Sequence, residues 1–99
     1  MMNSSQGSSI DLASLSGSSA LLTRNQAKAI RGQCEVMLKA SPTIILVLDG
    51  VKALSPSFAD ELFGVLRDKL GEEFAARVKI KCDKPAWKAL IMAVMARQR

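Results

Sequence analysis

One run of residues constrains the fold of this chain more than any other part of the sequence. Ile44 to Leu48 is an uninterrupted apolar stretch, rich in β-branched residues, and Asp49-Gly50 follows it with a turn signal. The run shows no alternation of apolar and polar residues, so it predicts a strand buried on both faces, as in the middle of a parallel sheet flanked by helices. It is far shorter than the ~20 apolar residues that cross a bilayer. We therefore expect an α/β domain with a central strand over residues 44–49.

Helix-start signals lie on both sides of this strand. Thr23-Arg24-Asn25-Gln26 fits the capping box, in which the Thr hydroxyl and the Gln amide satisfy backbone donors reciprocally. Ser57-Phe58-Ala59-Asp60 offers a second capping box, with Ser57 as its N-cap. Apolar residues at helical spacing follow each box. The sequence predicts helices over 24–40 and 57–70.

The C-terminal third predicts one more strand and one more helix. Arg77 to Cys82 alternates basic and apolar residues, which is typical of a half-exposed strand at a sheet edge. Pro85 suits the first turn of a final helix over 84–97. The fold class is therefore α/β, with a small, open, mostly parallel sheet, flanking helices and right-handed crossovers. The residues expected in the core are Leu46, Val47, Leu62, Leu66, Ile80, Trp87, Leu90 and Ile91.

The length of the chain limits its domain organisation. Its 99 residues and 10.7 kDa leave room for a single domain. Residues 1–9 are mostly Ser, Asn, Gln and Gly and predict a disordered tail, so we place the domain at residues 10–99. Ile10, Leu12 and Leu15 are the first spaced apolar residues and could form a short strand.

The residue types in the chain argue against catalysis. The sequence contains no His, which excludes Ser-His and Cys-His nucleophile pairs and His-ligated zinc. No Gly-rich phosphate loop is present, and we expect no metal, no cofactor and no enzymatic activity. Cys34 and Cys82 both fall in apolar stripes, where buried, reduced thiols are favoured over a reactive thiol. Residues 1–9 hold no Lys or Arg and no apolar core, so we expect no signal peptide and a cytoplasmic protein.

The charge of the chain is unevenly distributed. The net charge is +5, yet residues 77–99 alone carry seven basic residues against one acid, a balance of +6, which leaves −1 for residues 1–76. A basic face could attract nucleic acid or acidic lipid. The same lysines are explained by a solvated face and by protection of an edge strand. We favour the second interpretation, keep nucleic-acid binding as the alternative function, and expect no membrane partner.

A family resemblance rests on residues 46–63. The segment runs from Leu46 through Asp49, Gly50, Val51 and Ser57 to Phe63, and it resembles a bacterial STAS-like family of unknown function. That family shows a buried strand, an aspartate, a Gly-Val pair and then a Ser-x-x-Phe-Ala-Asp-Glu-Leu-Phe-like helix start. It is distantly similar to the STAS domains of anti-sigma factor antagonists.

The resemblance implies a regulatory module that binds another protein. In antagonist STAS domains a partner kinase phosphorylates a Ser or Thr at the start of the helix after the central strand, and Ser57 corresponds to it by position. Ser55 stands where an Asp is usual, and Phe58 replaces a Gly that lets a partner approach the backbone. The implied partner is an ATP-binding kinase or ATPase.

The candidate partner-binding or switch residues lie in the loop and helix start at residues 49–60. They are Asp49, Ser55, Ser57, Phe58 and Asp60. Three of them have a purely structural alternative: Asp49 as a turn residue, Ser57 as an N-cap, and Asp60 with Glu61 as helix-dipole partners. Adjacent helical residues point apart, so we expect the two carboxylates not to converge.

Overall fold

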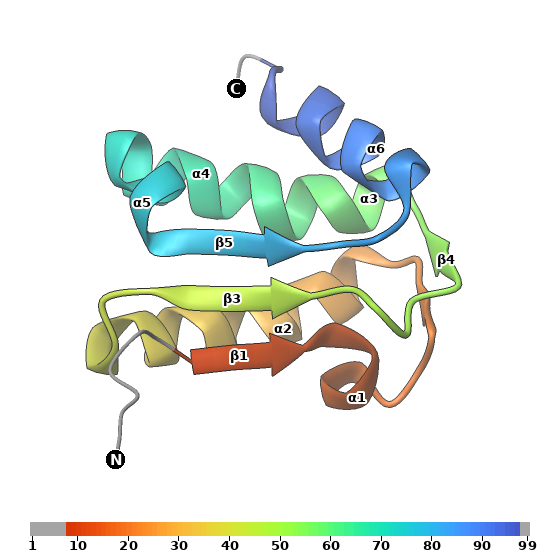
Figure 1. The fold of residues 1–99 in the computed structure, drawn as a ribbon, viewed down its shortest axis with the longest axis horizontal. Coiled ribbons are helices and arrows are strands. Elements are labelled where there is room, and N and C mark those ends of the chain that lie inside the picture. Colours follow the sequence, from red (N-terminus) through yellow and green to blue (C-terminus); the bar gives the residue numbers. More distant parts are fainter. Residues whose placement is uncertain (1–7, 98–99) are drawn as a thin grey trace.

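Three short parallel strands form the central sheet. In the computed structural model of the chain, which describes residues 8–97, β3 (Ile44–Val47) lies between β1 (Ser8–Asp11) and β5 (Val78–Lys81) and pairs in parallel with both. Figure 1 shows the three strands side by side with their carboxyl ends at the same edge. The parallel α/β fold predicted from the sequence is confirmed.

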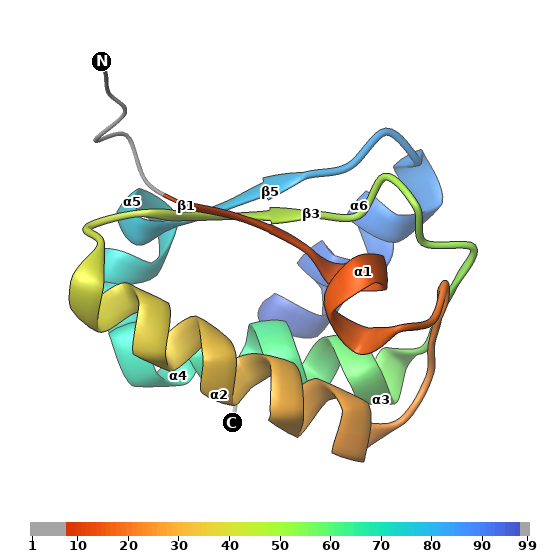
Figure 2. The ribbon, with the colours of Figure 1, turned by 90° about the horizontal axis from the view of Figure 1, so that it is seen from below.

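The main helices lie on one face of this sheet. The first is α2 (Arg24–Ala40). The second is a continuous helical segment made of α3 (Pro56–Ala59), a π-helical stretch (Asp60–Gly64) and α4 (Val65–Leu70). Figure 2 shows both on the same side of the strands. Half of the twelve largest fully buried side chains of the described residues lie in these strands and helices, among them Leu46, Phe58, Leu62, Phe63 and Leu66.

The second face of the sheet is open within the described residues. Ile44 and Leu46 are fully buried, whereas Ile45 and Val47 on the other face are half-buried, so the prediction of a strand buried on both faces is wrong. The strand order β1-β3-β5 advances in one direction across the sheet. Right-handed crossovers that advance in one direction place their helices on the same face, which explains the open one.

Shorter elements connect the strands and helices. Helix α1 (Leu12–Ser16) follows β1, and the two-residue strand β2 (Ala20–Leu21) pairs in parallel with β4 (Ala53–Leu54). A 3-10 turn (Gly71–Glu73) and α5 (Phe74–Arg77) lead into β5. The final helix α6 (Pro85–Met95) flanks the β5 side of the fold (Figure 1).

Most predicted boundaries hold to within about two residues. The helix over 24–40 and its Thr23–Gln26 capping box are confirmed, and β5 lies at a sheet edge as expected. Ser8 and Ser9 belong to β1, so the predicted tail of residues 1–9 is wrong for these two, and the rest of it lies outside the described residues. Four expected core residues are only half-buried, namely Val47, Ile80, Trp87 and Leu90.

No helix within residues 8–97 combines the length and the apolar character that crossing a membrane requires.

Candidate functional site

The loop after β3 begins with an ion pair between two strand ends. Asp49 is exposed just beyond β3, and its Oδ2 atom lies 2.8 Å from Nζ of Lys81, the last residue of β5. The hydrogen bond to Asp49 raises the pKa of Lys81 above its ordinary value. Asp49 thus acts as a turn residue that ties the two strand ends together at the edge where open α/β sheets place ligands.

The next residues of the loop are held from two sides. The side chain of Val51 is buried, and its carbonyl accepts a hydrogen bond from Nε1 of Trp87 at 3.4 Å. On the other side, the backbone N–H of Lys52 donates to the carbonyl of Ser19 at 2.8 Å, and β4 pairs with β2 directly afterwards. The loop is therefore fixed between the segment that precedes α2 and the start of α6.

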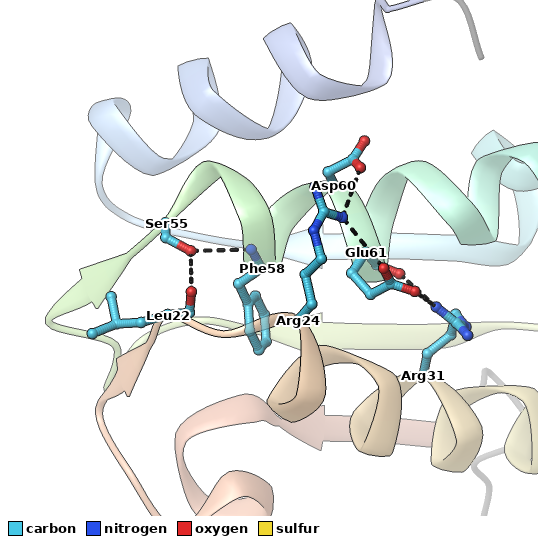
Figure 3. A network of polar contacts seen from close by, with 7 residues as sticks. All are labelled: Leu22, Arg24, Arg31, Ser55, Phe58, Asp60 and Glu61. Atoms are coloured by element: carbon cyan, nitrogen blue, oxygen red, sulfur yellow. Dashed lines mark hydrogen bonds and ion pairs between the residues drawn. The ribbon is translucent and has the colours of Figure 1, made fainter.

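Ser55 caps the helix that follows the loop. Its Oγ atom accepts a hydrogen bond from the backbone N–H of Phe58 at 3.0 Å and donates one to the carbonyl of Leu22 at 2.6 Å (Figure 3). The helix begins at Pro56, whose missing N–H suits the first helical position. The prediction that Ser57 is the N-cap is therefore wrong. Ser57 occupies the second helical position, where its side chain is exposed.

Phe58 lies in the core and offers no side-chain contact to a partner. It is completely buried, and its ring points inward between α2 and the sheet in Figure 3. Its expected place on the binding surface is wrong, because burying a Phe side chain against the helices is worth about 1.5–3 kcal/mol. Phe58 instead packs the start of α3 against the core.

Asp60 and Glu61 converge on α2. Nη1 of Arg24 lies 3.1 Å from Oδ2 of Asp60 and 3.3 Å from Oε1 of Glu61, and Nη1 of Arg31 lies 2.5 Å from Oε2 of Glu61 (Figure 3). The two carboxylates thus meet at one guanidinium, and the prediction that they do not converge is wrong. They sit at the start of the π-helical stretch, whose wider turn changes the directions of successive side chains.

This network makes Asp60 a structural residue. Asp60 is only 8% exposed and is paired with Arg24. The hydrogen bond from Arg31, together with that from Arg24, lowers the pKa of the neighbouring Glu61. The helix pattern of α2 alone does not predict either arginine as a partner of these carboxylates. The sequence nevertheless contains a signal for this contact. Arg24, Lys28 and Arg31 recur at helical spacing on one side of α2, and their positive charges are opposite to those of Asp60 and Glu61.

Four exposed side chains remain at the surface of this site. Asp49, Lys52, Pro56 and Ser57 are exposed, and the backbone beneath them is fixed by the contacts described above. Within residues 8–97, no group of three or more His, Cys, Asp or Glu side chains is placed to hold a metal ion. We call these four residues the rim of the loop.

Comparison with known protein families matches residues 26–85, more than half of the chain, to the STAS-like domain of unknown function (DUF4325). The chain belongs to this family. Comparisons with curated proteins and with solved structures give no match.

The family match confirms the resemblance, whose specific block is residues 46–63. The matched part of the STAS-like domain begins in α2 at Gln26 and ends at Pro85, so it includes β3, the rim of the loop and β5. The candidate residues all fall within it. Their arrangement in this STAS-like domain separates buried anchors, Phe58 and Asp60, from exposed rim positions.

Proposed function

We propose that this STAS-like domain is a non-enzymatic regulatory module that binds a partner protein through the loop and helix start at residues 49–60. The observation that carries the proposal is the exposed Ser57 at the beginning of a helix whose first turn is fixed by Ser55 and Phe58. A surface loop on a rigid base loses little conformational entropy on binding, which favours its use as a recognition element.

The contacts below the rim make this loop rigid. Ser55 bonds to Leu22, Val51 bonds to Trp87, and Asp49 pairs with Lys81, so three separate parts of the chain hold the loop. The rim residues themselves stay exposed above these contacts. A partner therefore meets a preformed surface of mixed charge rather than a loop that must first be ordered.

The surroundings of Ser57 are suited to a phosphate group. Asp60 and Glu61, one turn further along the helix, would repel a phosphate if they were unpaired, but Arg24 and Arg31 engage both carboxylates. The side chain of Arg24, which holds Asp60 and Glu61, is 50% exposed. By likeness to antagonist STAS domains, the partner to test first is an ATP-binding kinase or ATPase.

The experiment compares variants in affinity capture from a lysate of the source cells, followed by titration of the purified partner. Ser57→Asp and Lys52→Glu each add negative charge at the rim without touching a buried group. The matched control is Gln33→Glu, an exposed residue on the side of α2 that faces β1 and α1. We expect both rim variants to lower the affinity at least tenfold, and the control to leave it within twofold.

Equal affinities of the wild type and both rim variants for every captured protein would contradict the proposal. So would a measurable turnover that Asp49→Asn abolishes in a broad screen of hydrolase and transferase substrates, because the module would then be an enzyme.

A further inference from the structure

An apolar groove lies beside the β5 edge of the sheet, and none of its lining residues belongs to the rim of the loop. It has a volume of about 220 Å³ and is lined by Ile80 of β5 and by Lys88, Ile91, Met92 and Met95 of α6. Met92 is 67% exposed, which is unusual for a large apolar side chain next to other apolar groups. In Figure 1, α6 follows β5 after a short connection and then runs away from the strand.

The strand beside this groove has a free hydrogen-bonding edge. Within the described residues β5 pairs with β3 alone, and the carbonyl of Lys81 accepts a hydrogen bond from Leu48 on that side. Because backbone groups alternate between the two sides of a strand, the N–H and C=O of Ile80 face the free edge. The Ile80 side chain lines the groove, so the edge and the groove form one continuous surface.

The charges around this surface indicate which kind of molecule can bind to it. Lys79 and Lys81 are exposed on the open face of β5, and Lys88 is exposed at the groove. A second copy of this chain pairing edge to edge would bring these lysines together, and like charges on adjacent strands repel each other. A nucleic acid would place its phosphates against the methionines of the groove. An acidic, extended polypeptide satisfies the lysines and the backbone groups at once.

We propose that the free edge of β5 and the adjoining groove bind an extended segment of a partner protein in which acidic and apolar residues alternate. The segment adds to the sheet as a fourth strand, with its backbone paired to Ile80. Successive side chains of a strand point to opposite faces. The acidic residues therefore lie beside Lys79 and Lys81 on the open face, and the apolar residues enter the groove, where flexible methionines adapt to their shape.

The experiment titrates the ¹⁵N-labelled chain with a capped peptide of alternating glutamate and valine. The control ligand is the same peptide with lysine in place of each glutamate. The variants are Lys79→Glu combined with Lys88→Glu, and separately Met92→Asp, all at exposed positions. The matched control is Lys39→Glu combined with Arg67→Glu, which makes the same charge change at exposed sites on α2 and α4.

We expect the glutamate peptide to bind at least tenfold more tightly than the lysine peptide and to shift the amide resonances of Ile80 and Cys82. The double lysine variant loses at least tenfold in affinity and Met92→Asp at least fivefold, whereas the matched control stays within twofold. Ser57→Asp leaves this affinity unchanged, so the outcome is independent of the rim.

Several results would overturn the inference. They are the absence of binding, equal affinity for the two peptides, and resonance shifts confined to residues outside 78–95. A dimer of the free chain that Met92→Asp dissociates would assign the groove to a second copy. Duplex DNA that produces the same shifts at lower concentration than the peptide would assign the surface to nucleic acid.

Discussion

The hydroxyl of Ser55 joins the start of α3 to the segment before α2, because it donates to the carbonyl of Leu22 at 2.6 Å while accepting from the N–H of Phe58. One side chain therefore caps a helix and fixes the position of that helix against another part of the chain. The rim of the loop depends on this contact, since Pro56 and Ser57 follow Ser55 directly.

Replacing Ser55 by Ala should destabilise the fold by about 1–2 kcal/mol, because the helix loses its N-cap and the Leu22 carbonyl loses its partner. Urea denaturation followed by circular dichroism measures the free energy of unfolding. The matched control is Ser57→Ala, which removes an exposed hydroxyl one helical position beyond Pro56 and should change the stability by less than about 0.5 kcal/mol. Equal losses for the two variants, or a larger loss for Ser57→Ala, would contradict this assignment of the cap.

Glu61 should contribute a pH-dependent part of the stability. The hydrogen bond from Arg31 lowers the pKa of Glu61 from its ordinary value of 4.5. A carboxyl with a lowered folded-state pKa stabilises the fold fully above its ordinary pKa, and the contribution is lost as the pH falls through the folded value. Glu61→Gln should therefore lower the free energy of unfolding by about 1–3 kcal/mol at pH 7 and flatten its decline below pH 4.5.

The control for this experiment is Glu72→Gln, at an exposed position after α4, which should leave the pH profile unchanged. Urea unfolding at a series of pH values provides both profiles. If Glu61→Gln and the wild type lost stability in parallel below pH 4.5, the ion pair with Arg31 would make no contribution to folding.

Cys34 should be unreactive in the folded chain. Burial raises the pKa of its thiol to about 12, and its side chain is completely inaccessible. Since the thiolate is the reactive form, iodoacetamide at pH 8 should leave Cys34 unmodified in the native chain and alkylate it in denaturing urea. Mass spectrometry of the peptide that contains Cys34 reports both outcomes. Rapid alkylation of the native chain would show that α2 opens locally.

The nucleic-acid alternative makes its own prediction. Binding through phosphate contacts would weaken steeply with salt, with a log–log slope of roughly −0.9 per contact on duplex DNA. The lysines of β5 lie beside the apolar groove lined by Ile91, Met92 and Met95, against which the phosphates of a duplex find no partners. We expect no complex in a mobility-shift titration near physiological salt. A tight, salt-sensitive complex lost on neutralising Lys79, Lys81 and Lys88 would favour the alternative.

The sequence was most informative where a structure is specified by neighbouring residues. The capping box of Thr23 and Gln26 and the stop at Pro42 are local features, and α2 has the predicted bounds. The alternation in residues 77–82 likewise predicted the edge position of β5, because lysines on alternate residues suit a strand with one open face.

The errors arose where distant residues decide the outcome. Both Ser55 and Ser57 could cap a helix, and the choice depends on the Leu22 carbonyl, which lies 33 residues away from Ser55 in the sequence. The composition of β3 could not reveal that both crossover helices lie on one face. The two-residue strands β2 and β4 have no periodic pattern to detect.

The candidate site shows the same division. The position of Asp49 and the presence of a helix soon after it followed from the strand, the turn and the family resemblance, whereas the residue that caps this helix did not. The burial of Phe58 and the convergence of Asp60 with Glu61 did not, because they depend on packing against α2 and on the π-helical turn.

The central claim is that a partner protein contacts the rim of the loop, and amide hydrogen exchange of the domain with and without a captured partner tests it most directly. We predict slower exchange in peptides covering residues 49–58 when the partner is bound, and no slowing there in Ser57→Asp at the same partner concentration. Slowing confined to residues 78–97, or unchanged exchange at residues 49–58 in the saturated complex, would contradict the claim.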